Sequence, residues 1–284
     1  MTENAKIRSA PEQLGLLLRM IGLSFINMFV MGLLLGGSAA SVSPTTSKLL
    51  QMAATFVMFG IPAIVFVRLS YTQRGWCQLG FRRASLASYY LLGILVLVVA
   101  IPFEVWLGLL NRNIPLPNWA IKAEEMAERQ TRTLLAAKSG LDVAFNVLVM
   151  AVIPGIFEEM FFRGVVQRLL IGITKRPWLG ICITAAIFSF MHFELQGFLP
   201  RFFLGILLGA MFRYSGSIWT CILGHAVFNG IQVVLASYYP ETMDNKNPSL
   251  PLYSVLVSLV LVLILLGIMR RRSQQTDGAN VNPV

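Results

Sequence analysis

Three short polar motifs lie inside long apolar stretches of the chain, and their residue types are those of a hydrolytic site. The first contains two adjacent carboxylates, Glu158 and Glu159. The other two contain His192 and His225, the two histidines of the chain. Carboxylates and imidazoles can exchange protons with a bound water, which is what hydrolysis of an amide requires. Such side chains are costly in lipid, so at membrane depth they indicate a functional site rather than packing.

The two adjacent glutamates are expected to have different roles. Glu159 and Arg163 are four residues apart, so in a helix they form an ion pair along one face. Glu158 is rotated by about 100° from its neighbour in a helix. It can therefore face a pocket while Glu159 is neutralised. Pro154 lies one turn upstream and has no N–H to donate, so we expect a kink or a loosened turn that admits water.

The histidine motifs suggest how water and the oxyanion are held. Phe188 precedes His192 by four residues and His225 precedes Asn229 by four, so each pair shares a helix face. In one mechanism Glu158 takes a proton from a water that His192 orients, while His225 and Asn229 donate hydrogen bonds to the tetrahedral intermediate. In the other, Glu158, His192 and His225 are the ligands of a catalytic zinc ion. The sequence has no HExxH motif and leaves both mechanisms open.

The elements that position these motifs are predicted to be membrane helices. The chain is 56% hydrophobic and 13% charged, with a mean hydropathy of +0.70, whereas a soluble domain is about 25% charged. The apolar runs are continuous rather than alternating, which favours helices over a barrel. We expect one integral membrane domain over residues 1–284, an all-α bundle of about eight spans, or of seven. The predicted spans are Leu16–Leu35, Leu49–Leu69, Tyr89–Leu110, Leu141–Phe162, Leu179–Phe193, Phe198–Phe212, Ile218–Ala236 and Pro251–Met269.

Charge predicts how the bundle is oriented. The net charge of +10 comes mainly from Lys and Arg in loops that share one side, which is typical of cytoplasmic loops and not of a nucleic-acid surface. Both termini are therefore predicted to be cytoplasmic. Residues 111–140 form an external loop with a helix, and residues 273–284 a disordered tail. The basic residues on the predicted cytoplasmic side include Lys6, Arg8, Arg68, Arg82, Arg83, Lys175, Arg176, Arg213, Arg270, Arg271 and Arg272.

The three motifs resemble the CAAX protease and bacteriocin-processing family of intramembrane proteases, also called the CPBP or Abi family. That family is marked by EExxxR, FxxxH and HxxxN or HxxxD on successive helices. The same order and spacing occur here within a core of residues 141–236, as Glu158-Glu159-xxx-Arg163, Phe188-xxx-His192 and His225-xxx-Asn229. The resemblance implies an intramembrane endopeptidase, similar to CAAX prenyl endopeptidases, that hydrolyses membrane-associated proteins or peptides by a glutamate or a metal mechanism.

Two other functions compete with proteolysis. A proton-coupled carrier would also place Glu and His at membrane depth, although carriers more often show two related halves. A bis-histidine haem protein would leave EExxxR unexplained. The sequence assigns no role to Glu104 or Glu194; Glu104 could line the pocket or pair with an arginine such as Arg201. Gly205 and Gly209 form a small-xxx-small pair that favours close helix packing.

Overall fold

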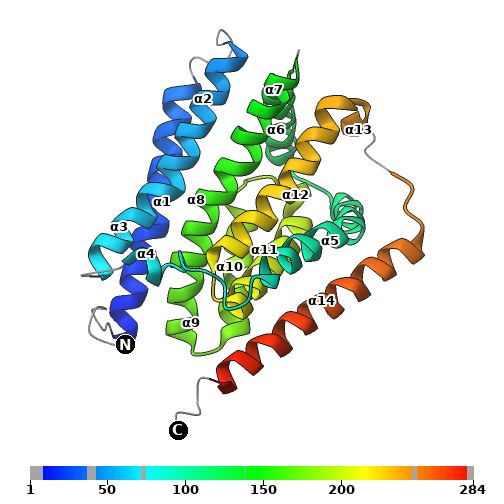
Figure 1. Ribbon diagram of the computed structural model, residues 1–284. Helices are drawn as coiled ribbons and strands as arrows, with labels where there is room; N and C mark the ends of the chain where they lie inside the picture. Colours follow the sequence, from blue (N-terminus) through cyan, green and yellow to red (C-terminus); the bar gives the residue numbers. More distant parts are fainter. Residues whose placement is uncertain (1–8, 37–42, 72–74, 138, 245–247, 280–284) are drawn as a thin grey trace.

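The protein is described by a computed structural model that covers residues 9–36, 43–71, 75–137, 139–244 and 248–279. The described residues are almost entirely helical and contain no β-strand, which confirms the predicted all-α class. The elements, shown in Figure 1, are α1 (Ala10–Gly36), α2 (Pro44–Thr55), η1 (Phe56–Gly60), α3 (Ile61–Ser70), α4 (Gly75–Gln78), α5 (Ser88–Arg112), α6 (Asn118–Leu135), α7 (Gly140–Val147), η2 (Leu148–Val152), α8 (Ile153–Phe161), η3 (Phe162–Gln167), α9 (Arg168–Thr174), α10 (Pro177–Phe190), η4 (Leu195–Gly197), α11 (Phe198–Ser215), α12 (Ile218–Tyr238), α13 (Glu241–Asp244) and α14 (Leu252–Ala279).

Among the described residues, seven helical stretches are long and apolar enough to cross a membrane. The predicted span Leu179–Phe193 differs, because α10 has 14 residues and ends at Phe190. At 1.5 Å per residue such a helix is about 21 Å long, which is shorter than the ~30 Å hydrocarbon core. The prediction that His192 lies on a helix is therefore wrong: this residue follows the helix in a turn.

The longest membrane helix carries the two glutamates. The stretch Gly140–Thr174 is continuous over 35 residues. Two of its segments, η2 and η3, have the wider π-helical turn. Pro154 follows directly after η2, at the start of α8, so the expected loosened turn is a π-helical segment. Such segments are rare and occur often at functional sites.

Close helix packing surrounds this stretch. At Gly155 on α8, an added Cβ would lie 3.4 Å from the Ala226 Cβ on α12. At Gly205 on α11 it would lie only 2.8 Å from the Ala185 Cβ on α10. The absence of a side chain at these glycines lets the helix backbones approach closely, which is the role expected for Gly205 in the small-xxx-small pair.

The polar segments outside the spans are also mostly helical. Within the predicted external loop of residues 111–140, α6 carries i,i+4 ion pairs from Arg129 to Glu125 at 3.9 Å and from Arg132 to Glu128 at 2.8 Å. The C-terminal helix α14 continues to Ala279, so residues 273–279 are helical where a disordered tail is predicted. The rest of that tail, residues 280–284, lies outside the described residues.

Candidate active site

A cavity of about 1110 Å³ lies within the bundle, and the side chains predicted to do chemistry share it. Its lining includes Glu158 from α8, His192 from the turn after α10, and His225 and Asn229 from α12. Helices α5, α6 and α11 complete the wall. The predicted residues from three separate segments of the sequence thus meet in one polar cavity, as the helix spacing suggested.

Glu158 faces this cavity. Its side chain is buried, with a relative exposure of 8%. Within the described part of the chain, none of the hydrogen bonds or ion pairs of the protein involves its carboxylate. The carboxylate therefore keeps its acceptor capacity for a water or a substrate group in the cavity.

Glu159 points away from the cavity and holds two partners. Its Oε1 lies 3.0 Å from Arg163 Nη1, in the geometry of an ion pair rather than of a hydrogen bond. The same oxygen accepts a hydrogen bond from His225 Nδ1 at 2.9 Å. The pairing with Arg163 agrees with the sequence. The contact with His225 was not foreseen, because nothing in the spacing places α8 beside α12.

This contact fixes the state of His225. A carboxylate only accepts hydrogen bonds when ionised, so Nδ1 carries the proton of this bond and Nε2 is left for the cavity. The buried guanidinium of Arg163 donates further to the Gly205 carbonyl oxygen at 3.3 Å. One turn on, Gln167 donates to the Gly209 carbonyl at 3.1 Å. Arg163, which pairs with the Glu159 carboxylate behind His225, is thus bound to α11.

Phe188 holds the two histidines at a fixed spacing. Its ring centroid is 5.0 Å from that of His192 and 6.2 Å from that of His225. The Arg163 guanidinium carbon lies over the same ring, 5.0 Å from the centroid. The sequence treats Phe188 as a ring one turn before His192, whereas in the structure the same ring contacts both imidazoles.

His192 is held by its own backbone. Its Nδ1 lies 2.9 Å from the Phe188 carbonyl oxygen. A carbonyl can only accept, so Nδ1 is the donor and Nε2 is again left for the cavity. The next residue, Phe193, has a positive φ of 57°, which is unusual for a bulky residue and is found where surrounding contacts enforce it.

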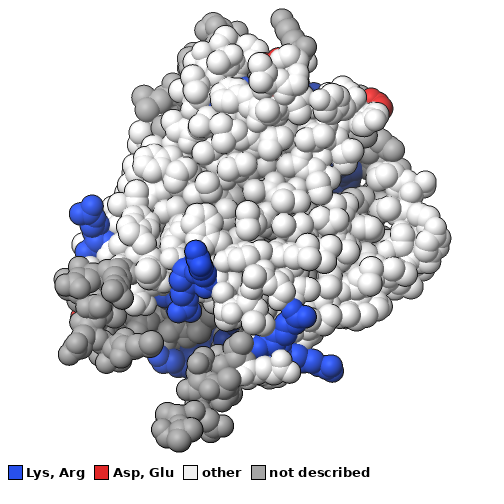
Figure 2. Space-filling model, viewed as in Figure 1, with Lys and Arg blue, Asp and Glu red and all other residues white. Residues whose placement is uncertain are grey.

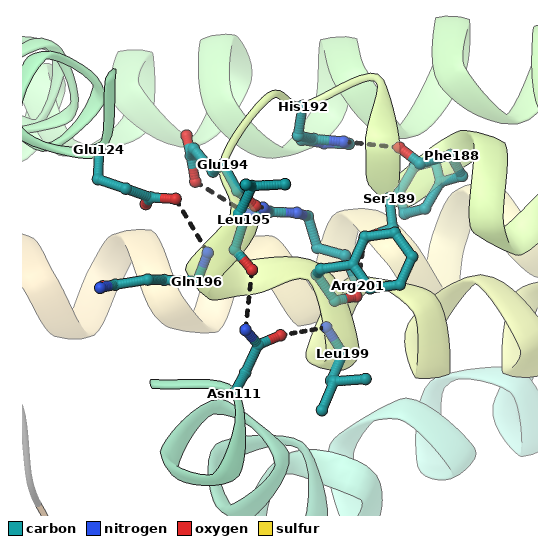
Figure 3. A network of polar contacts seen from close by, with 11 residues as sticks. Asn111, Glu124, Phe188, Ser189, His192, Glu194, Leu195, Gln196, Leu199 and Arg201 are labelled. Carbon is teal, nitrogen blue, oxygen red and sulfur yellow. Dashed lines mark hydrogen bonds and ion pairs between the residues drawn. The ribbon is translucent and has the colours of Figure 1, made fainter. Parts of the chain in front are cut away.

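A network of side chains enforces the turn that carries His192 (Figure 3). Asn111, at the end of α5, donates to the Leu195 carbonyl at 2.8 Å and accepts from the Leu199 N–H at 2.7 Å. Glu124 on α6 accepts from the Gln196 N–H at 2.9 Å. Because three elements bind one short segment, the position of His192 is determined by tertiary contacts.

The acidic residues that the sequence left unassigned lie around the same turn. Glu194 forms an ion pair with Arg201 at 2.9 Å, and the Arg201 guanidinium also donates to the Glu194 carbonyl. Glu104 lines the cavity. Asn111 and Glu124 were missed as site residues. A polar Asn at the end of a span was a signal, but its partners lie 84 and 88 residues further along the chain.

The zinc alternative needs three ligands grouped around one point. Across the described ranges, no three His, Cys, Asp or Glu side chains are placed to hold one metal ion. The set of Glu158, His192 and His225 does not form such a group in this arrangement. The proposed mechanism therefore contains no metal-dependent step.

Fold and site together define an all-helical, polytopic membrane protein whose polar cavity contains carboxylate, imidazole and amide side chains. Residues 140–231 match the family model described as type II CAAX prenyl endopeptidase, Rce1-like. This match confirms the resemblance carried by the three motifs and supports an intramembrane protease of the CAAX type. The comparison with curated proteins and the comparison with solved structures found no match.

Proposed function

We propose that this protein is an intramembrane endopeptidase that cleaves membrane-associated proteins or peptides with a water activated by Glu158. The observation that carries the proposal is the orientation of Glu158 into the cavity without a protein partner, while its neighbour Glu159 is bound to Arg163 and His225. Glu158 is therefore free to accept a proton from water, whereas Glu159 holds Arg163 and His225 in position.

The other groups of the cavity have complementary roles in this mechanism. Glu158 removes a proton from water as the water oxygen attacks the scissile carbonyl, with His192 Nε2 accepting a hydrogen bond that orients the water. Asn229, one turn after His225 on α12, donates a hydrogen bond to the oxyanion. The proton held by Glu158 then passes to the leaving amine, and two new chain ends result.

His225 must be protonated on Nε2 to assist the oxyanion. With Nδ1 donating to Glu159, an imidazolium would present an Nε2–H to the cavity, stabilised by the carboxylate behind it. A proton-coupled carrier would need the same titratable groups, but it would not need an amide such as Asn229 in the cavity beside a free carboxylate.

The decisive experiment compares two carboxylates that line the same cavity, Glu158 and Glu104. Glu158→Gln is expected to reduce turnover of a membrane-tethered peptide reporter by roughly 10²- to 10⁴-fold, the usual contribution of a general base. Glu104→Gln, the matched control, should keep most of the turnover. Both variants are purified and checked for the wild-type melting temperature, and the assay is repeated with a chelator to address zinc. Normal turnover by folded Glu158→Gln would contradict the proposal.

A further inference from the structure

The cavity opens toward one end of the bundle only. On α5 its lining begins at Glu104 and continues to Arg112, the last residue of the helix. On α11, which runs the opposite way, the lining is confined to the first seven of its 18 residues, at Pro200, Arg201 and Leu204. The lining residues of these antiparallel helices thus lie at the same end, and α6 contributes to the wall there.

The other two helices of the site give the same direction. In the 35-residue stretch Gly140–Thr174, the lining residues Met150, Pro154 and Glu158 fall between the start of the stretch and its middle. On α12 the lining begins at His225 and continues to Gln232, so the first seven residues of the helix do not take part. The cavity therefore ends near mid-depth and does not continue to the far end.

That far end carries both termini and most of the basic charge. Figure 1 places the first turns of α1 and the last turns of α14 at the same end of the bundle as α9. Figure 2 shows blue side chains gathered in this part of the visible face. The described cations at this end lie at four places: between α3 and α5, between α9 and α10, between α11 and α12, and in the last turns of α14. They are Arg68, Arg82, Arg83, Lys175, Arg176, Arg213, Arg270, Arg271 and Arg272.

At the cavity end the cations are fewer and several have acidic neighbours. Arg129 and Arg132 are paired with glutamates of the same helix, and Lys48 donates to the Ala136 carbonyl. Basic loops are retained in the cytoplasm during membrane insertion. The cavity end is therefore the one that faces away from the cytoplasm.

We infer that the catalytic cavity is entered from the non-cytoplasmic side of the membrane. Its substrate is then a polypeptide that presents its scissile bond from that side, such as an exported peptide or the outer part of a membrane-inserted segment. A volume of about 1110 Å³ is slightly above the usual range for small-molecule sites, about 300–1,000 Å³, which suits several residues of an extended chain. The substrate class rests on the proposed protease function, whereas the direction of entry does not.

Thiol labelling tests the direction of entry without any activity assay. Cys77 is exposed on α4, at the basic end, and serves as the internal control once Cys182 and Cys221 are replaced by alanine. Asn113 and Thr131 line the cavity at its open end, which we call the cavity mouth. The variants Asn113→Cys and Thr131→Cys each place a thiol there. A membrane-impermeant maleimide added to intact cells should label both new thiols and should label Cys77 only after permeabilisation. Labelling of Cys77 in intact cells, with the mouth thiols protected, would overturn the inference.

A second measurement addresses the substrate class. An unstructured peptide reporter is tethered to a single-span anchor so that it faces either the cytoplasm or the opposite side. Cleavage of the outward-facing reporter is expected, with loss of cleavage for the inward-facing copy. Cleavage of the inward-facing copy alone would overturn the inferred substrate class. If neither copy is cleaved while the mouth thiols are labelled from outside, the direction of entry stands and the proposed function fails.

Discussion

At the scale of single residues, the site is organised by the different surroundings of two neighbouring glutamates. Glu158 faces the cavity, whereas Glu159 is fully buried between Arg163 and His225. Because the two residues are adjacent on a helix, their side chains point in different directions. The contact of Glu159 with His225, rather than its ion pair with Arg163, connects Glu159 to the chemistry of the site. It holds an imidazole as well as neutralising a guanidinium, so it is a positioning residue.

Replacing Glu159 by Gln should lower both stability and activity. The change leaves the buried Arg163 without its counter-charge, and removing one partner of a buried pair costs about 3–5 kcal/mol. It also weakens the bond that orients His225, so turnover per folded molecule should fall by roughly 10²- to 10⁴-fold, by analogy with the orienting carboxylate of a hydrolytic triad. Thermal unfolding and turnover corrected for the folded fraction measure the two effects.

A second variant of the same helical stretch distinguishes an effect on the position of His225 from an effect on the stability of the bundle. Gln167 lies one turn after Arg163 on the same stretch, is also buried, and donates to the Gly209 carbonyl on α11. Gln167→Leu should destabilise the bundle while turnover per folded molecule stays near the wild-type value. If Glu159→Gln behaved in the same way, with normal turnover after correction, its role would be limited to the ion pair with Arg163.

At the scale of elements, the short helix α10 makes the site accessible. It ends at Phe190, about 21 Å from its start at 1.5 Å per residue, so the turn that follows lies below the membrane surface. Polar backbone groups at that depth need partners inside the protein. Asn111, Glu124 and Arg201 supply them, and the same contacts place His192 in the cavity.

Removing the contacts of Asn111 should loosen this turn. Asn111→Leu keeps the approximate volume but leaves the Leu195 carbonyl and the Leu199 N–H without their partner, and each unsatisfied buried group costs about 1–3 kcal/mol. We expect faster hydrogen exchange in residues 191–199 and a lower turnover. Leu110→Ala, an exposed neighbour on the chain that does not line the cavity, is the control and should change neither. Unchanged exchange in Asn111→Leu would show that the other contacts suffice to hold the turn.

At the scale of the whole molecule, the separation of charge between the two ends determines orientation. The end with both termini carries the arginine cluster Arg270–Arg272, whose last member also donates to Ser88 Oγ at 2.5 Å. The protein therefore combines a basic, closed end with an open end that leads to the cavity. Since the direction of insertion depends on loop charges, the charges predict the orientation, and the inferred side of substrate access combines this prediction with the position of the cavity.

The side on which the C-terminus lies can be measured directly. A short epitope placed after Val284 should be protected from added protease in intact cells and digested once the membrane is opened, because the arginines before it remain in the cytoplasm. Replacing Arg270, Arg271 and Arg272 by serine should weaken this preference only in part, since other loops at the same end are also basic. Digestion of the epitope in intact cells would contradict the predicted orientation of the termini.

The class of the fold and the residues of the three motifs could be predicted from the sequence, whereas Asn111 and Glu124 could not. Continuous apolar runs can satisfy their backbone in lipid only as helices, and the i,i+4 spacing of Glu159 and Arg163 predicts their ion pair from local geometry alone. These features depend on residues close together in the chain, so a local pattern contains the information.

The contacts between side chains of different helices could be known only from the tertiary structure. The bond from His225 to Glu159 spans 66 positions of sequence, the ring of Phe188 meets both histidines, and the clamp of Asn111 on the turn after α10 joins segments more than 80 residues apart. The premature end of α10 also depends on partners supplied by other helices. Such contacts arise from how the helices pack, which side-chain periodicity along one helix does not encode.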